Sequence, residues 1–210
     1  MAKTAAREEN LSSASRESRM VSRRLAREFR LVGSLAAADA DGNANDINRD
    51  VPSQTWSDSI RDDFEFANTY ELIFTSDVDN DDRTETVRIY LDGTTLKEKV
   101  WEWSRDSVRW RAPVTRELAS GVDYVMFDFY DRQQTRIPEP TGYPQGGFTL
   151  TSGDRQRVTV VEVTVVTRSE HAENQSAEYL VMPDGHSFRD RYKRSVQRFM
   201  IRGRNLSLGA

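Results

Sequence analysis

Apolar or small side chains recur every three or four residues along the first 33 positions, which is the spacing of one helical stripe. These positions are Leu11, Ala14, Ser18, Val21, Leu25, Phe29 and Val32. Gly33 follows the last of them and suits the end of a helix. The pattern therefore predicts one long N-terminal helix of about 30 residues, roughly 45 Å in length, whose start projects beyond a small domain.

After this helix the pattern changes twice. Residues Leu35 to Arg61 lack periodicity, and the turn-forming run from Ala40 to Asp46 together with Pro52 predicts a long loop. Beyond it the residues alternate as strands do. The predicted strands are Tyr70 to Thr75, Glu85 to Leu91, Thr95 to Trp101, Val122 to Tyr130, Val158 to Thr167 and Ser195 to Arg204. Asp92-Gly93 predicts a tight hairpin turn.

A helix followed by a run of antiparallel strands predicts the α+β class, with a long N-terminal helix packed on antiparallel sheet. We expect two parts, the helix over residues 1–34 and a globular β-rich domain over residues 35–210. Within the strand from Val122 to Tyr130, alternation predicts that Val122, Tyr124 and Met126 share one face. Pro and Gly residues from Ile137 to Gly147 predict a further loop.

Residue usage narrows the chemistry. The 210 residues include no Cys, and the only histidines are His171 and His186. Thiol nucleophiles, disulfides, iron–sulfur clusters and Cys-based zinc sites are therefore excluded. Two histidines also leave few candidates for a His-based catalytic triad. The sequence predicts that the protein is not an enzyme. A net charge of −4 gives no indication of a nucleic-acid partner, and no run of 18 apolar residues spans a bilayer.

Charge is segregated along the chain. Residues 1–33 carry eight basic and four acidic side chains, residues 39–85 carry three and 14, and residues 186–210 carry seven and one. Their net charges are +4, −11 and +6. Two interpretations stay open. The segments can be differently solvated faces, or they can be complementary patches that stack neighbouring subunits.

The run from Asp77 to Glu85 is the sharpest chemical signal. Asp77, Asp79, Asp81 and Glu85 occupy positions 1, 3, 5 and 9 of a turn, where carboxylates converge as a calcium ion requires. Asp82 stands where a turn glycine is expected, so the match to an EF-type loop is incomplete. Calcium is the one cofactor that the sequence indicates, and a solvated acidic turn is the alternative interpretation.

Three tryptophans suggest a second candidate surface. Trp101 and Trp103 alternate along one predicted strand, and Trp110 follows closely. They can pack in the core under the helix, or they can form a surface for a sugar or another partner.

Four stretches together resemble a known family. They are Ser22 to Gly33, Leu72 to Asp81 with Val87 to Gly93, Leu118 to Asp131, and Tyr192 to Asn205. They include the runs Tyr90-Leu91-Asp92-Gly93 and Phe127-Asp128-Phe129-Tyr130-Asp131. In these stretches the chain is similar to the globular domains of type IV minor pilins of the PilW kind and of GspJ-like minor pseudopilins of type II secretion.

The resemblance implies a non-enzymatic subunit that starts or caps a type IV pilus or a secretion pseudopilus. It implies a place in the cell envelope, at the periplasmic face of the inner membrane and in the filament, with other minor pilins or pseudopilins and the major pilin as partners. Family members begin with a hydrophobic half-helix that anchors them in the membrane. That half is absent here, so we expect Met1 to begin inside a truncated helix.

The same resemblance assigns the helix to subunit contacts. The residues expected there are Leu11, Val21, Arg23, Arg24, Leu25 and Arg27. The alternative function is an extracellular, calcium-stabilised β-rich module for binding or adhesion, which would use the acidic hairpin and the tryptophan strand. The motifs do not distinguish a pilus from a secretion system.

Overall fold

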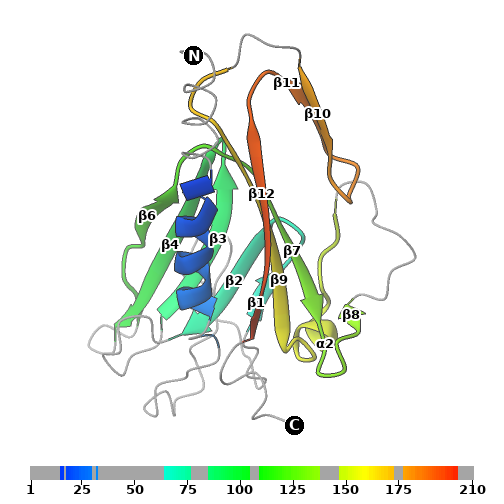
Figure 1. Cartoon of the computed structure of the whole chain (residues 1–210). Helices are drawn as coiled ribbons and strands as arrows, with labels where there is room; N and C mark the ends of the chain where they lie inside the picture. Colours follow the sequence, from blue (N-terminus) through cyan, green and yellow to red (C-terminus); the bar gives the residue numbers. More distant parts are fainter. Residues whose placement is uncertain are drawn as a thin grey trace.

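The computed structural model describes residues 15–16, 18–29, 32, 64–76, 85–104, 109–137, 147–172 and 177–202. Strands make up 56% of this part and helix 14%, so the fold is β-rich (Figure 1). The expectation of an α+β, pilin-like fold with a long N-terminal helix is wrong. The N-terminal helix is described only over residues 15–16 and 18–29, and Leu11 and Ala14 lie outside the described residues. Its buried stripe is short, whereas the two-residue alternation of strands covers most of the described chain.

The strands form two antiparallel sheets. In the first sheet the order is β1 (Phe64–Ala67), β2 (Glu71–Ser76), β3 (Glu85–Asp92), β4 (Thr95–Ser104) and β5 (Arg109–Trp110), and β6 (Val114–Ala119) also pairs with β4. In the second the order is β12 (Arg194–Arg202), β9 (Val160–Arg168), β7 (Val122–Tyr130) and β8 (Arg136–Ile137). A separate hairpin pairs β10 (Glu178–Val181) with β11 (Ser187–Asp190), and α2 (Ser152–Arg155) is a single turn.

The six strands predicted from alternation are confirmed as β2, β3, β4, β7, β9 and β12, with ends shifted by up to three residues. The predicted hairpin is also confirmed, since Asp92 pairs with Thr95 around Gly93. Gly93 has a φ of 60°, which a two-residue hairpin turn requires at this position and which glycine adopts without strain. Strands β1, β5, β6, β8, β10 and β11 were not predicted.

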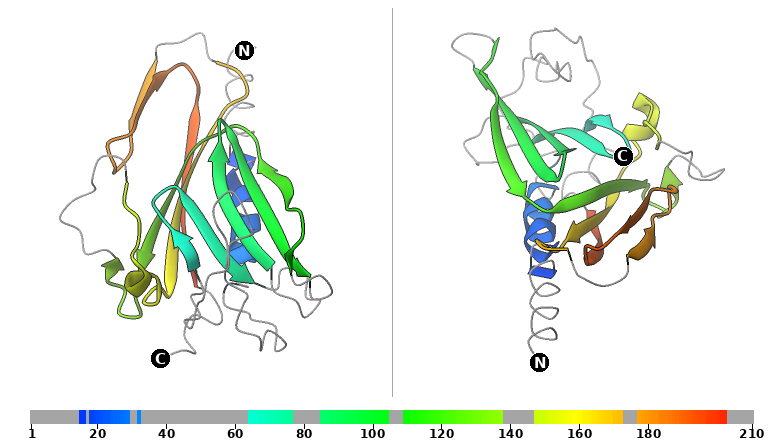
Figure 2. Two further views of the ribbon diagram at one scale, coloured as in Figure 1. Left: turned by 180° about the vertical axis from the view of Figure 1, so that it is seen from behind. Right: turned by 90° about the horizontal axis from the view of Figure 1, so that it is seen from above.

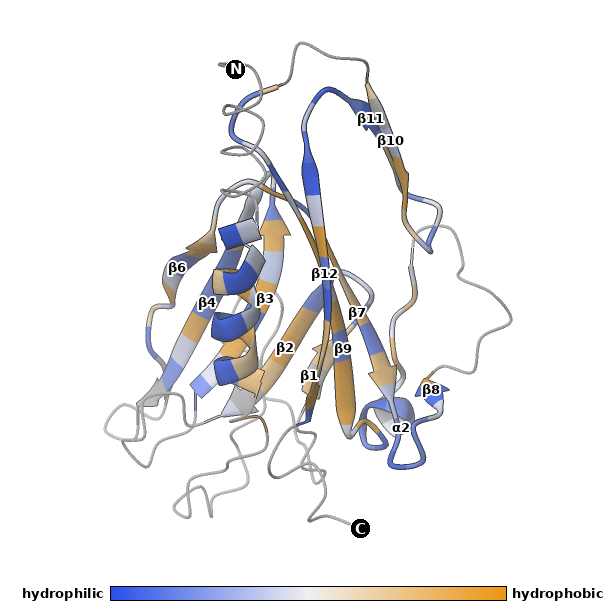
Figure 3. Ribbon diagram, viewed as in Figure 1, coloured by the Kyte–Doolittle hydropathy of each residue, from blue (hydrophilic) through white to orange (hydrophobic). Residues whose placement is uncertain are grey.

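The N-terminal helix lies in the angle between the two sheets (Figure 2, right), and all three elements share one core. Phe29 joins them, because its ring lies 5.3 Å from the ring of Phe74 in β2 and 6.1 Å from the ring of Phe127 in β7. Val21 and Leu25 are fully buried beside it. The hydropathy colouring shows the same division, with apolar strands facing a helix whose outer side is polar (Figure 3).

A second, smaller core lies on the far face of the second sheet. Tyr124, Met126, Val166 and Met182 form it, and the hairpin β10–β11 covers it. The alternation predicted for β7 holds from Tyr124 onward. Val122 is the exception, because the register shifts between Val122 and Tyr124 and turns Val122 into the main core.

Candidate functional site

The N-terminal helix presents arginines to solvent opposite its buried stripe. The stripe consists of Ser18, Val21, Leu25 and Phe29, none more than 2% exposed. The exposed positions on the other side are Arg16, Arg19, Met20, Arg23 and Arg27, which we call the arginine face. This division follows from the helical repeat, because residues three and four apart fall on one side.

Like charges follow one another along the arginine face. Arg19, Arg23 and Arg27 follow one another at i,i+4, where like charges destabilise a helix by about 0.2–0.5 kcal/mol per pair. Arg23 forms no ion pair or hydrogen bond with any residue in the described ranges. An anionic partner on this face would relieve the repulsion, so the arrangement favours binding of negative charge.

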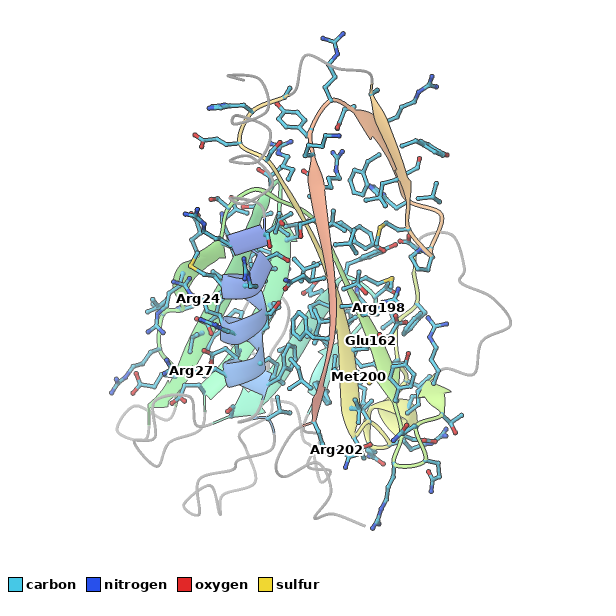
Figure 4. All side chains as sticks on the ribbon, viewed as in Figure 1. Arg24, Arg27, Glu162, Arg198, Met200 and Arg202 are labelled. Carbon is cyan, nitrogen blue, oxygen red and sulfur yellow. The ribbon has the colours of Figure 1, made fainter. Side chains whose placement is uncertain are left out.

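The helix is fixed on both flanks. On one side Arg24 donates a hydrogen bond of 2.6 Å to the carbonyl oxygen of Leu118 in β6. On the other side the Ser22 hydroxyl donates to Oε1 of Gln197 in β12, at 2.6 Å. Arg24 is seen on the β6 side of the helix in Figure 4. These contacts hold the arginine face in one orientation.

Two carboxyls interact where this helix meets β4. Burial raises the pKa of Glu28 in the helix and of Glu98 in β4, and Arg27 and Arg116 act in the opposite direction on both. Arg116 also approaches Glu98, with 3.9 Å between Nη1 and Oε2. The positive charge of Arg27 is therefore partly offset by Glu28 and Glu98, whereas Arg23 is exposed to solvent.

An ionic cluster fixes the start of β12 to its neighbours. The guanidinium of Arg194 lies 2.7 Å from Oδ2 of Asp123 in β7 and 2.6 Å from Oδ1 of Asp190 in β11. Its side chain is only 5% exposed, and it stacks 4.3 Å over the ring of Phe188. The hydrogen bond from Arg194 and the further hydrogen bond from the Tyr192 backbone lower the pKa of Asp190. The cluster ties the hairpin β10–β11 to the second sheet.

A tyrosine–aspartate cluster holds the other end of the hairpin. The Tyr70 hydroxyl donates a 2.7 Å hydrogen bond to Oδ2 of Asp184, and the backbone N–H of His186 donates to Oδ1 at 3.0 Å. Burial alone would raise the pKa of Asp184. The hydrogen bonds from Tyr70 and Tyr124 outweigh burial, so the pKa of Asp184 is lowered. Burial and the Asp184 carboxylate raise the pKa of Tyr124. The carboxylate oxygens are therefore already engaged in holding the hairpin.

We expect this cluster to lower the free energy of unfolding as pH rises into the alkaline range. Burial and the hydrogen bond to Asp184 raise the pKa of Tyr70 to about 12 from its usual 10.0. The folded state thus favours the neutral phenol, so its contribution is complete below pH 10 and is lost as pH rises toward 12. Urea unfolding at pH 9 to 12 should show a steeper loss in the wild type than in Tyr70→Phe. Tyr179→Phe, at a residue that is 70% exposed, is the control and should follow the wild type. Equal slopes for all three proteins would contradict the assignment.

The predicted calcium ligands are only partly described. Asp77, Asp79 and Asp81 lie outside the described residues, as does Leu11 of the predicted helix contacts. Glu85 begins β3 and is 3% exposed. No group of three or more His, Asp or Glu residues suited to a metal ion occurs in the part of the chain that the structure describes.

The structure bears on two of the predicted roles. Val21 and Leu25, expected at subunit contacts, are fully buried in the core of their own chain, whereas Arg23 and Arg27 are exposed. Trp101 is also fully buried, which supports core packing over a partner surface. Its face of β4 is the one opposite the helix, because Val100 next to it packs in the helix-facing core.

The other two tryptophans are described by their backbones alone. Trp103 in β4 pairs with Trp110 in β5, and the side chains of both lie outside the description. The prediction of a tryptophan surface therefore stays a prediction for these two residues.

Sequence reasoning missed both polar clusters around the hairpin. Tyr70 and Asp184 are 114 residues apart in the chain, and Arg194 and Asp123 are 71 apart. No local spacing connects such pairs. The one usable signal is Asp190 with Arg194, which are four residues apart.

Comparison with protein-family models and with curated proteins finds no match for this chain. None of the helices in the described ranges is long and apolar enough to cross a membrane.

Proposed function

We propose that the protein is a non-enzymatic assembly subunit, a minor pilin or minor pseudopilin that helps to start or cap a type IV pilus or a type II secretion pseudopilus. The arginine face of the N-terminal helix is the observation that carries this proposal. It is an exposed basic surface on an element that is held rigidly from both flanks. Rigid presentation lowers the ordering cost of binding.

The charge distribution supports contacts between subunits. The helix is basic on its outer side, and residues 39–85 of the same chain carry a net charge of −11. Opposite net charges on two segments of one chain favour head-to-tail stacking, in which each subunit uses a different surface toward each neighbour. Such contacts fix register and association rate more than affinity.

Reversing charge on the arginine face is expected to abolish assembly. The double variant Arg23→Glu/Arg27→Glu changes the face by four charge units at exposed positions, so the domain should stay folded. Filaments would be counted by electron microscopy in cells whose own copy of the gene is deleted and replaced by the variant. We expect loss of filaments or of secretion through the system.

The matched control is Arg132→Glu/Arg189→Glu, which makes the same charge change at exposed positions on the β7–β8 turn and on β11. It should assemble as the wild type does. Unchanged assembly of the helix variant, with normal protein levels and circular dichroism, would contradict the proposed role of the arginine face.

The competing function is a calcium-stabilised binding module. No observation on the described residues favours it, because its metal ligands at 77–81 lie outside them and Trp101 is buried. The genomic sequence upstream of Met1 separates the two functions. A hydrophobic segment of about 20 residues behind a short leader supports the assembly subunit, and its absence supports the module.

A further inference from the structure

β12 is the edge strand of the second sheet, because no strand in the described ranges pairs with its other side. All nine of its residues pair with β9 without a register shift, from Arg194 opposite Arg168 to Arg202 opposite Val160. The strand contains no proline and no bulge, which are common means of keeping an edge from accepting a further strand. The edge is therefore long and regular enough to add one.

The hydrogen bond just before β12 shows which backbone groups face this open edge. The N–H of Ser169 donates to the carbonyl oxygen of Lys193 at 2.8 Å, so Lys193 directs its backbone groups toward the β9 side. Backbone groups alternate in direction along an antiparallel strand, so the odd-numbered residues up to Ile201 also point toward β9. The residues that direct their N–H and C=O groups outward are the even-numbered Val196, Arg198, Met200 and Arg202. Within the described ranges these outward groups have no hydrogen-bond partner.

The same four residues direct their side chains to one face of the sheet, away from the main core. Val196 lies opposite Val166, which belongs to the smaller core on the far face. Val196 is 47% exposed and Met200 is 65% exposed, and the side chain of Arg198 is 53% exposed. Apolar and basic side chains therefore alternate along the outward-bonding positions (Figure 4 labels Arg198, Met200 and Arg202).

The two arginines at this edge are not fully neutralised. Arg202 has no ion pair or hydrogen bond with any residue in the part that the structure describes. The Nε of Arg198 lies 3.5 Å from Oε1 of Glu162, a carboxylate that also accepts a hydrogen bond of 2.8 Å from the Tyr130 hydroxyl. A neighbouring strand with acidic side chains opposite these arginines would gain cross-strand ion pairs.

The N-terminal helix adds positive charge on the other face of the edge. Ser22 donates its 2.6 Å hydrogen bond to Gln197, which lies opposite Val165 and so faces the main core. Arg19 precedes Ser22 by three residues, so it lies on the same side of the helix, and it is exposed. A strand added at this edge would have arginines near both of its faces, which favours an acidic segment.

The same arginines disfavour a second copy of β12 as the partner. Arg198 and Arg202 are four residues apart, at alternate outward-bonding positions. Antiparallel pairing of two β12 edges would therefore set an arginine of one copy opposite or diagonal to an arginine of the other. Like charges placed opposite each other destabilise a sheet. The arginine spacing thus favours a strand of different sequence.

We propose that the free edge of β12 binds an extended segment of a different protein as an added antiparallel strand, with acidic side chains opposite Arg198 and Arg202 and an apolar side chain opposite Met200. The pattern that the edge recognises is an acid, an apolar residue and an acid at alternate positions. Backbone hydrogen bonds hold the segment, and its alternate side chains give selectivity. The contact goes beyond the assembly role proposed above and does not depend on it.

The test measures binding of the fluorescein-labelled peptide Glu-Thr-Val-Thr-Glu-Thr-Val to the whole chain by fluorescence anisotropy. Its alternate residues would lie opposite Arg202, Met200, Arg198 and Val196. We expect saturable binding that weakens about tenfold in Arg198→Gln/Arg202→Gln, because two cross-strand ion pairs are lost. The matched control Arg132→Gln/Arg189→Gln removes the same charge at other exposed positions and should leave binding unchanged.

A control peptide separates strand addition from plain attraction between charges. Glu-Glu-Thr-Thr-Val-Thr-Val has the same composition without the alternation, so it should bind more weakly. Equal binding of the two peptides would overturn the proposal in favour of a general attraction of acidic chains to the arginines.

A second readout needs no variant. In the wild-type chain, amide hydrogen exchange followed by NMR should slow on peptide binding at the outward-bonding residues Arg198 and Met200. It should change little at Gln197 and Phe199, whose N–H groups already face β9. Absence of binding, binding without this alternating protection, or equal binding by Arg198→Gln/Arg202→Gln would overturn the proposal.

Self-association is measured separately by analytical ultracentrifugation of the wild-type chain. We expect no self-association that depends on Arg198 and Arg202. A dimer that the double variant loses would overturn the proposal in favour of a second copy as the occupant. The filament counts for Arg23→Glu/Arg27→Glu test only the proposed function, so the two proposals can fail independently.

Discussion

Replacing Arg194 by alanine is expected to lower the free energy of unfolding by about 3–5 kcal/mol. The guanidinium is buried between the carboxylates of Asp123 and Asp190. Its removal takes the ion-pair partner from Asp190 and leaves the buried Asp123 with Arg168 alone, at 3.4 Å. For a chain of this size the loss corresponds to a fall in Tm of about 6–20 °C. Urea unfolding followed by circular dichroism measures it.

Arg198→Ala is the matched control for Arg194. It lies on the same strand, and its side chain is 53% exposed beside Glu162. Ion pairs at exposed positions contribute about 0–1 kcal/mol, so this variant should remain close to the wild type. Equal losses for the two variants would show that the Arg194 cluster contributes no more than a surface pair.

Phe29→Ala is expected to cost about 3–5 kcal/mol, as large-to-small changes of buried aromatic residues do. The ring contacts both sheets through Phe74 and Phe127. Its loss opens a cavity at the place where helix and sheets meet. Calorimetry should show a lower Tm, and hydrogen exchange of the helix amides should accelerate more than exchange in β9.

Met20→Ala, on the exposed side of the same helix, is the control for Phe29. Alanine favours helix, and Met20 makes no part of the core, so a change within about 0.5 kcal/mol is expected. A comparable loss in both variants would mean that helix propensity rather than burial determines the effect.

Alternation was sufficient to predict the central strands, because alternate residues of each strand pack in the main core. Thr95 to Trp101 and Val122 to Tyr130 carry that signal clearly. The short strands could not be predicted in this way. β8 has only two residues, and most of β6 (Val114–Ala119) is exposed, so neither shows an alternation of burial. The helical stripe was also correct from Ser18 to Phe29, but its extension to a long helix and an α+β fold was not.

The polar contacts could not be predicted from the sequence. Tyr70 meets Asp184 only because the hairpin β10–β11 folds over the far face of the second sheet. The ionic cluster likewise needs Arg194 and Asp123, which come together because β12 and β7 belong to the same sheet. By contrast, the exposure of Arg23 and Arg27 follows directly from the helical repeat once the buried side is known.

The anchoring of the helix on both flanks has a mechanical consequence. The helix runs beside β12 and beside β6, and it is attached to each by a hydrogen bond of 2.6 Å (Figure 1). A force along the helix axis therefore pulls the helix parallel to both sheets. The two hydrogen bonds and the contacts of the buried stripe then bear this force together. A force perpendicular to the axis would lift the helix from the sheets at one end and break the same contacts one after another. We therefore expect a larger force to be needed to detach the helix by pulling along its axis than by pulling perpendicular to it.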